Sequence, residues 1–120
     1  RIRWFDNVKN SQAKYVYQFS DFFLLPSRQE IFGMVLLESM YFGNIVISSN
    51  NAGAATLIRN GENGFIIKDF DADNWNKALE RAINCDRQKI GRRARETVKS
   101  GFTWNKIALK MKNVIDGEAL

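Results

Sequence analysis

Three short runs of apolar residues recur along the chain, at intervals of about twenty residues. Within each run the apolar residues are continuous rather than alternating, which is typical of strands covered on both faces, as in a parallel sheet. The segments between the runs are long enough to hold crossover helices, so the pattern predicts βαβ units. The predicted strands are 22–25, 45–47 and 65–67, and a further strand is expected at 2–5.

Apolar residues at helical spacing predict helices between and after these strands. One segment, 34–42, is nearly all apolar and is expected to be a buried helix. Segment 71–84 is clearly amphipathic, with acidic residues in its first turn, and 104–115 repeats this pattern. The predicted helices are 11–19, 34–42, 71–84, 87–99 and 104–115.

These elements predict an α/β fold, namely a partial Rossmann-like parallel sheet with flanking helices and a helical C-terminal tail. The chain has 120 residues, enough for one domain with a core but short for an enzyme that binds two substrates. It begins without methionine, and we interpret it as a piece of a longer protein. No repeat or linker divides it, so residues 1–120 are expected to form one partial domain.

Composition narrows the chemistry. Histidine is absent and Cys85 is the only cysteine, which excludes an ordinary zinc site and both serine–histidine and cysteine–histidine catalysis. A lone cysteine suits a cytoplasmic protein, and no apolar run approaches the length needed to cross a bilayer. Carboxylates, backbone groups or a bound ligand must therefore do the chemistry, and neither a metal nor a cofactor is expected.

The net charge of +5 is unevenly spread, since residues 87–112 contain nine basic residues and a single acid, Glu96. This run is either a solvated helical face or a surface that attracts anions, such as cytoplasmic-leaflet lipid or a phosphorylated acceptor. Nucleic acid is not expected, because no binding motif accompanies the charge. The basic residues are Arg87, Lys89, Arg92, Arg93, Arg95, Lys99, Lys106, Lys110 and Lys112.

The segment 26–40 is the best candidate for a functional site. It follows a predicted buried strand and opens a predicted helix, and ligands of doubly wound folds bind beyond the carboxyl ends of strands. Free backbone N–H groups and the helix dipole favour an anion there, phosphate above all. Gly33 permits close approach of the backbone to such a ligand.

Two acids sharpen this interpretation. Glu38 is the only charged residue of 34–42, and a buried carboxylate needs a hydrogen-bonding partner because its desolvation is costly. Glu30 precedes it by eight positions, or roughly 12 Å if the span were fully helical, about the length of a sugar–diphosphate–ribose unit. Alternatively, Glu38 pairs with a core arginine or reaches solvent, and Glu30 is simply a loop acid.

The flanking residues resemble the large retaining glycosyltransferase family with the two-domain GT-B fold (glycosyltransferase group 1, or family 4 type). The resemblance begins with the E-x7-E pattern from Glu30 to Glu38 within P-S-x-x-E-x-F-G-x-x-x-x-E-[AS]-M. It continues through Gly43, the strand 45–48, the turn at Ala52 and Gly53, N-G-E-N-G-F-I-I at 60–67, and F-T-W at 102–104. Nearly the whole chain is covered, in the family's order.

The resemblance implies a role for each site residue. Glu30 would hold hydroxyls of the transferred sugar and position or charge-stabilise the reacting centre, and Glu38 would hold the ribose hydroxyls. The family generally transfers sugar with retention and without a divalent metal. Backbone N–H groups would contact the sugar and diphosphate, namely those of Phe32, Gly33, Met34 and Val35.

The resemblance also implies partners. The donor would be a nucleotide-diphosphate sugar, with UDP-sugars favoured and GDP-mannose possible. The acceptor would be a saccharide or lipid-linked saccharide, used in surface polysaccharide synthesis. The protein would be cytoplasmic, with peripheral contact at the inner face of the plasma membrane through its basic helices.

The chain departs from the family's pattern in several places. Ile45 stands where proline is usual, and Thr56 stands near a usual acid. The basic phosphate-binding residues of the first strands and the N-terminal acceptor domain are missing, so this piece alone is expected to be inactive. In the strand order 3-2-1-4-5-6, strand 2–5 would lack neighbours, and the exposed sheet edge would favour a homo-oligomer or disorder.

Two alternatives remain open. A GT-B-like sugar-nucleotide epimerase would keep the fold and donor, although such enzymes often use histidine as an acid or base. A non-catalytic basic binding module would use neither acid, so that Glu30→Ala and Glu38→Ala would leave all binding unchanged.

Overall fold

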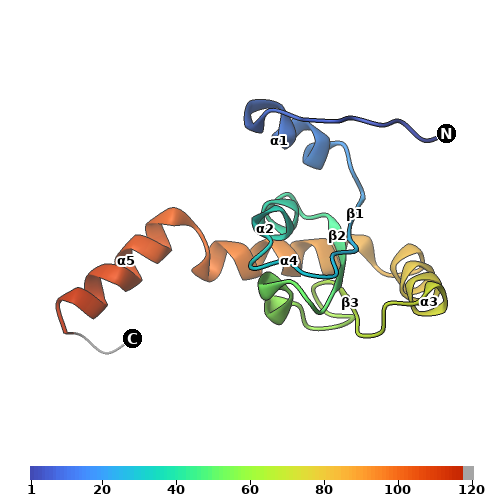
Figure 1. Cartoon of the computed structure of the whole chain (residues 1–120). Helices are drawn as coiled ribbons and strands as arrows, with labels where there is room; N and C mark the ends of the chain where they lie inside the picture. Colours follow the sequence, from blue (N-terminus) through green and yellow to red (C-terminus); the bar gives the residue numbers. More distant parts are fainter. Residues whose placement is uncertain (118–120) are drawn as a thin grey trace.

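Three parallel strands form the centre of the computed structural model, which describes residues 1–117 (Figure 1). The strands are β1 (Phe22–Leu25), β2 (Ile45–Ser49) and β3 (Phe65–Ile67), and their spatial order follows the chain. Phe22 pairs with Ile45, and Ile47 pairs with Phe65. The three strands predicted at 22–25, 45–47 and 65–67 are therefore confirmed, as is the α/β fold.

Each face of the sheet is covered by helices, as the continuous apolar runs predicted. Alternate strand residues point to opposite faces, so Val46 packs among residues of α2 and α4, whereas Ile45 and Ile47 pack among residues of α3. Every residue of β2 is buried. Leu36 and Met40 of α2 are fully buried against this sheet, and each such side chain contributes about 1.5–3 kcal/mol.

Residues 1–117 form five α-helices, and their positions agree with the predicted helices to within two residues at each end. The helices that follow β3 begin at side-chain caps, as expected for Asp and Thr. Asp71, Asp86 and Thr103 accept hydrogen bonds from the backbone N–H groups of Asn74, Lys89 and Lys106. The helices are α1 (Asn10–Gln18), α2 (Met34–Tyr41), α3 (Ala72–Ile83), α4 (Arg87–Gly101) and α5 (Trp104–Ile115).

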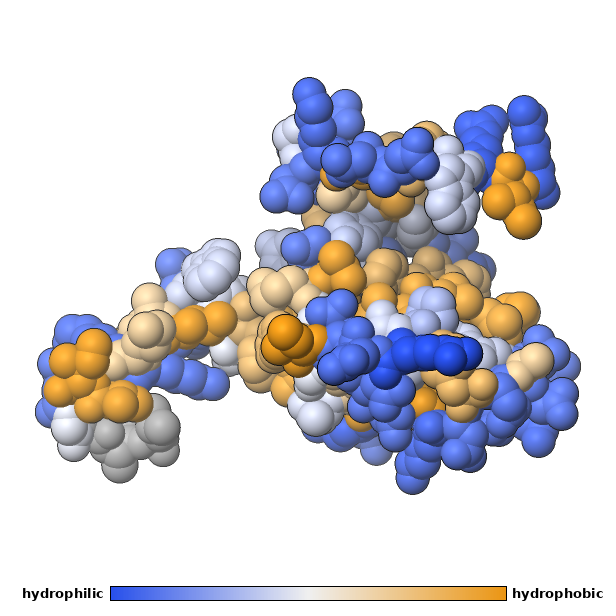
Figure 2. All heavy atoms as spheres, in the orientation of Figure 1, coloured by the Kyte–Doolittle hydropathy of each residue, from blue (hydrophilic) through white to orange (hydrophobic). Residues whose placement is uncertain are grey.

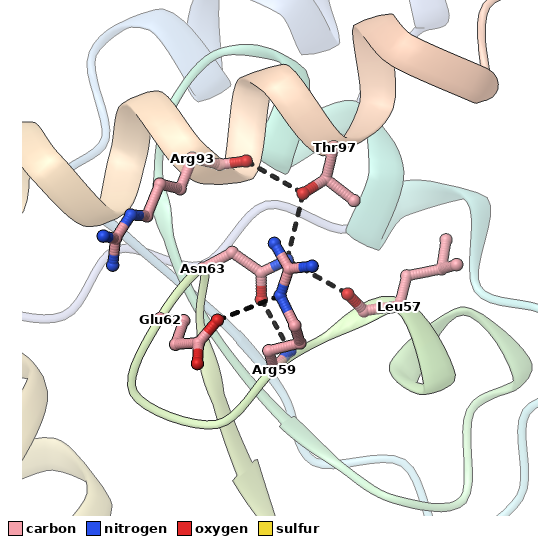
Figure 3. Close-up of polar contacts among 6 residues, drawn as sticks. All are labelled: Leu57, Arg59, Glu62, Asn63, Arg93 and Thr97. Carbon is pink, nitrogen blue, oxygen red and sulfur yellow. Dashed lines mark hydrogen bonds and ion pairs between the residues drawn. The ribbon is translucent and has the colours of Figure 1, made fainter.

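The crossover from β2 to β3 contains a 3₁₀-helix, η1 (Gly53–Leu57), followed by a turn held by Asn63. The Asn63 side chain accepts a hydrogen bond from the Arg59 N–H at 2.7 Å. It also donates to the Leu57 carbonyl and to Thr97 Oγ1 of α4, both at 3.0 Å (Figure 3). One fully buried amide therefore joins the turn before β3 to α4.

The strand predicted at 2–5 is wrong. This segment has no regular structure, and Ile2, Trp4 and Phe5 are highly exposed. A strand needs a partner for its backbone groups, and within residues 1–117 segment 2–5 pairs with no strand. The expected sheet edge at this position is therefore absent, and β1 and β3 form the two edges of the sheet.

Helix α5 projects from the end of α4, away from the sheet (Figure 1). Its amphipathic sequence forms the predicted helix, but none of its residues is buried. Trp104, Leu109 and Met111 are each more than half exposed, and hydrophobic residues line this arm in Figure 2. Within residues 1–117, no helix combines the length and apolarity that crossing a membrane requires.

Candidate functional site

The candidate site lies at the carboxyl ends of β1 and β2, where two loops join. The loop after β1 runs through residues 26–33, and the loop after β2 leads into η1. The Ser49 hydroxyl donates to the Ser27 carbonyl, and the Ala54 N–H donates to the Phe32 carbonyl at 2.7 Å. These bonds hold the first loop against the second at the edge where α/β sheets bind ligands.

Gly33 is the N-cap of α2 and has the left-handed backbone that favours glycine, with φ of +84°. It supplies no side-chain cap to the helix. The first backbone N–H groups of an α-helix have no partner within the helix, and here Met34 and Val35 are exposed at 48% and 39%. The start of α2 therefore presents uncapped donors to an exposed surface, which favours an anion.

The backbone at Gly53 packs closely against the loop that precedes α2. A Cβ atom on Gly53 would lie 2.5 Å from the Ile31 carbonyl oxygen, so only glycine fits there. The Phe32 side chain also lies against Gly53 and is 40% exposed. The glycine turn predicted at 52–53 therefore packs against the loop before α2 and supports it.

Glu30 lies in this loop, half-buried and paired with Ala52 in an isolated parallel bridge. Its Cγ atom would contact a Cβ on Gly33 at 3.4 Å, so the carboxylate stem lies beside the start of α2. Helix α2 begins at Met34, as predicted, so Glu30 lies in the loop before the helix and the length of a fully helical span does not give its separation from Glu38. The positive φ of Gly33 separates the loop that holds Glu30 from the helix that holds Glu38.

Glu38 is exposed, so the expectation that it is buried is wrong. Helix α2 buries one face, with Leu36, Leu37 and Met40, and leaves the other open. Residues three and four apart share a helix face, which places Glu38 beside Val35 and Met34. The structure thus brings Glu38 and the exposed start of α2 together on one surface, and it places Glu30 in the adjoining loop.

Sequence reasoning missed Tyr17 of α1, which is the hydrogen-bonding partner of Glu38. The Tyr17 hydroxyl donates to Glu38 Oε2 at 3.0 Å. Burial, the hydrogen bond to Glu38 and the negative charge of Glu38 raise the pKa of Tyr17 to about 12. A hollow of about 270 Å³ between the helices is lined by Asn10, Ala13, Lys14, Tyr17, Glu38 and Phe42.

A larger hollow, of about 470 Å³, lies at the opposite edge of the sheet. Asp21 and Asn44, which precede β1 and β2, line it together with arginines of α4. Parallel sheets bind ligands at their carboxyl ends, so the larger hollow, at the amino ends of β1 and β2, is not the candidate site, whereas the smaller hollow includes Glu38 in its lining. Within residues 1–117, no group of three or more His, Cys, Asp or Glu side chains could hold a metal ion.

Comparison with known families identifies the class of protein to which this geometry belongs. Residues 1–97 match the family described as "Glycosyl transferases group 1". The chain belongs to this family. The match spans the whole candidate site, including both loops, α2 and the Asn63 turn.

Relatives within the family differ in their named reactions. The chain is 31% identical over 122 aligned residues to D-inositol 3-phosphate glycosyltransferase of Corynebacterium diphtheriae, covering 100% of this chain and 28% of the relative. It is 33% identical over 107 residues to glycogen synthase of Desulforudis audaxviator, covering 82% and 21% respectively. The group 1 chain described here thus spans between a fifth and a third of the length of these relatives.

Solved structures confirm the fold as that of GT-B glycosyltransferases. Sucrose-phosphate synthase from Thermosynechococcus elongatus superposes with a TM-score of 0.75 at 30% identity, covering 85% of this chain and 26% of that one. HepE from Anabaena, in complex with UDP, superposes with a TM-score of 0.75 at 21% identity, covering 85% and 29%. The predicted partial GT-B domain is therefore confirmed in its fold.

Proposed function

We propose that residues 1–120 form the C-terminal, nucleotide-sugar-binding domain of a retaining glycosyltransferase. The observation that supports this most is the exposed, uncapped start of α2, with Glu30 in the loop before it and Glu38 on its open face. The amide groups suit a diphosphate, and carboxylates suit the hydroxyl groups of a sugar and a ribose. Family membership supports the same class of reaction.

Each site residue has a proposed role. Glu30 holds hydroxyls of the transferred sugar near the reacting centre, and Glu38 holds the ribose hydroxyls. The backbone N–H groups at Phe32, Gly33, Met34 and Val35 receive the diphosphate and sugar. Binding energy from the ribose and diphosphate then orients the sugar for transfer, which is how groups remote from the reaction contribute to its rate.

A UDP-sugar is the favoured donor. Two solved neighbours support it, since HepE from Anabaena has been solved with UDP and with UDP-glucose. We propose a saccharide or lipid-linked saccharide as acceptor, and a cytoplasmic location in peripheral contact with the membrane. The exposed lysines beside the apolar residues of α5 support that contact, because basic amphipathic helices bind anionic lipid surfaces.

Ligand-observed NMR on the 120-residue chain tests the donor site. UDP, GDP, CDP and ADP are offered together, and one of them is expected to give a selective signal that Glu38→Ala removes. The same measurement on the complete gene product separates a failed site from one that needs further residues. Silence from all four nucleotides in the complete protein would reject the proposal.

Glu30→Gln tests the role nearest the chemistry. In the complete gene product it is expected to lower kcat strongly while changing nucleotide affinity less, because its partner is the sugar rather than the nucleotide. An unchanged kcat would reject this role for Glu30.

A further inference from the structure

A single hydrogen bond joins α1 to the open face of α2. The donor is the hydroxyl of Tyr17, and the acceptor is Oε2 of Glu38 at 3.0 Å. The two residues differ sharply in their surroundings, since Tyr17 is only 9% exposed whereas Glu38 is exposed. A buried side chain thus fixes one oxygen of an otherwise solvent-facing carboxylate.

The Tyr17 ring is itself held from two sides. It stacks on Phe42, with ring centroids 5.8 Å apart and planes 18° apart. It also meets Phe23 of β1 edge-on, with centroids 6.0 Å apart. Such ring pairs add stability beyond the area that they bury, so the position of the hydroxyl is set by the packing around β1 and α2.

The other carboxylate oxygen of Glu38 remains available. Within residues 1–117 no hydrogen bond or ion pair engages Oε1, and Glu38 lines the hollow of about 270 Å³ between α1 and α2. An exposed glutamate normally samples several rotamers, and ordering it on ligand binding costs conformational entropy. The bond from Tyr17 removes much of that freedom before a ligand arrives.

We propose that Tyr17 is a positioning residue for nucleotide recognition, which holds Oε2 of Glu38 so that Oε1 faces the hydroxyls of a ligand. The inference rests on the proposed function, in which Glu38 holds the ribose. The raised pKa of Tyr17 agrees with this role, because the hydroxyl keeps its proton and remains a donor at neutral pH. The ring packing would survive Tyr17→Phe, whereas the hydrogen bond would not.

The test compares nucleotide affinity among variants of the complete gene product by isothermal titration calorimetry. The probe is whichever of UDP, GDP, CDP and ADP the wild type binds. Tyr17→Phe is expected to raise its Kd about five- to tenfold, within the range for the net contribution of a single hydrogen bond. Glu38→Gln is expected to raise Kd at least as much, and the double variant is expected to match Glu38→Gln alone.

A second probe separates positioning from general damage to the fold. The 2′,3′-dideoxy form of the same nucleotide lacks the hydroxyls that Glu38 would hold, so its Kd is expected to be the same in Tyr17→Phe and wild type. For the intact donor, KM is expected to rise more than kcat falls. Tyr15→Phe is the matched control, because Tyr15 is exposed on the same helix and contacts Lys14 rather than Glu38.

The outcomes are distinguishable. If Glu38→Gln weakens binding and Tyr17→Phe does not, the positioning role is overturned and the donor site stands. If Tyr17→Phe weakens the nucleotide and its dideoxy form equally, the effect is structural and the inference is also overturned. If Glu38→Gln changes nothing, or no nucleotide binds, then the ribose role of Glu38 fails and takes this inference with it.

Discussion

Replacing Asn63 with alanine tests how the turn before β3 is stabilised. The Asn63 amide is fully buried and makes three hydrogen bonds, to the Arg59 N–H, the Leu57 carbonyl and Thr97 Oγ1 (Figure 3). Thr97 also donates to the Arg93 carbonyl at 2.9 Å, so it keeps one partner when the amide is lost. The two backbone groups of the turn would each lose the Asn63 bond, and alanine cannot replace it.

The expected loss of stability follows from these two groups. Each buried polar group left without a partner costs about 1–3 kcal/mol. Arg59 is exposed, so water can reach its N–H and lower that part of the cost. We therefore expect Asn63→Ala to reduce the free energy of unfolding by about 3 kcal/mol, a large fraction of the roughly 5–15 kcal/mol typical of a domain.

Urea unfolding followed by tryptophan fluorescence measures this loss. Asn60→Ala is the matched control, because Asn60 lies in the same turn, is exposed, and accepts a single hydrogen bond from the Ile66 N–H at 3.2 Å. The control is expected to lose less than about 1 kcal/mol. Equal losses in the two variants, at unchanged m-value, would refute the reasoning that burial makes Asn63 costly to remove.

Three further predictions use the same unfolding measurement. A Cβ on Gly91 would lie 2.3 Å from the Gly43 carbonyl oxygen, so Gly91→Ala is expected to reduce the free energy of unfolding by about 1–3 kcal/mol through overpacking. The control is Gly101→Ala, whose Cβ would meet only the end of the Lys110 side chain at 3.5 Å and which is not expected to show this loss. The pKa of Tyr17 is raised to about 12 in the folded protein, whereas an unfolded tyrosine ionises near pH 10. The free energy of unfolding is therefore expected to be full below pH 10 and to fall between pH 10 and 12, more steeply in the wild type than in Tyr17→Phe. Asp71→Ala removes the cap on Asn74 N–H and is expected to cost about 1 kcal/mol, whereas a loss near zero would mean that water replaces the cap.

The sheet could be predicted because its strands are buried on both faces. An apolar cluster lies on each face of the sheet, so a central strand needs apolar residues pointing both ways, and every residue of β2 is buried. Helix α3 could be predicted for a different reason, since one face of 72–83 is apolar and Asp71 caps its start. In both cases the spacing of apolar residues along the chain matches the positions that the strand or the helix buries.

The geometry of the site could be predicted only in part. Gly33 was identified because a glycine before a helix permits close approach, and its positive φ accounts for that residue physically. The partner of Glu38 could not be predicted, because Tyr17 lies 21 positions earlier in the chain and nothing in its spacing points to α2. Contacts of that kind depend on how two helices meet, which a pattern along one helix does not specify.

The expectations that failed share a physical cause. Segment 2–5, the outer face of α2 and one side of α5 are largely apolar. A strand was expected at the first and burial at the second, yet all three are exposed in the structure. A sequence pattern reflects burial in the protein's working state, whereas 120 residues can bury only the surface that they themselves cover. Isolated exposed apolar residues are ordinary, but extended apolar surfaces mark interactions. We propose that this domain is part of a larger glycosyltransferase, and that proposal predicts exposed apolar surfaces around an intact sheet. The sheet is covered by the helices of this chain, whereas the outer surfaces would contact the rest of the enzyme.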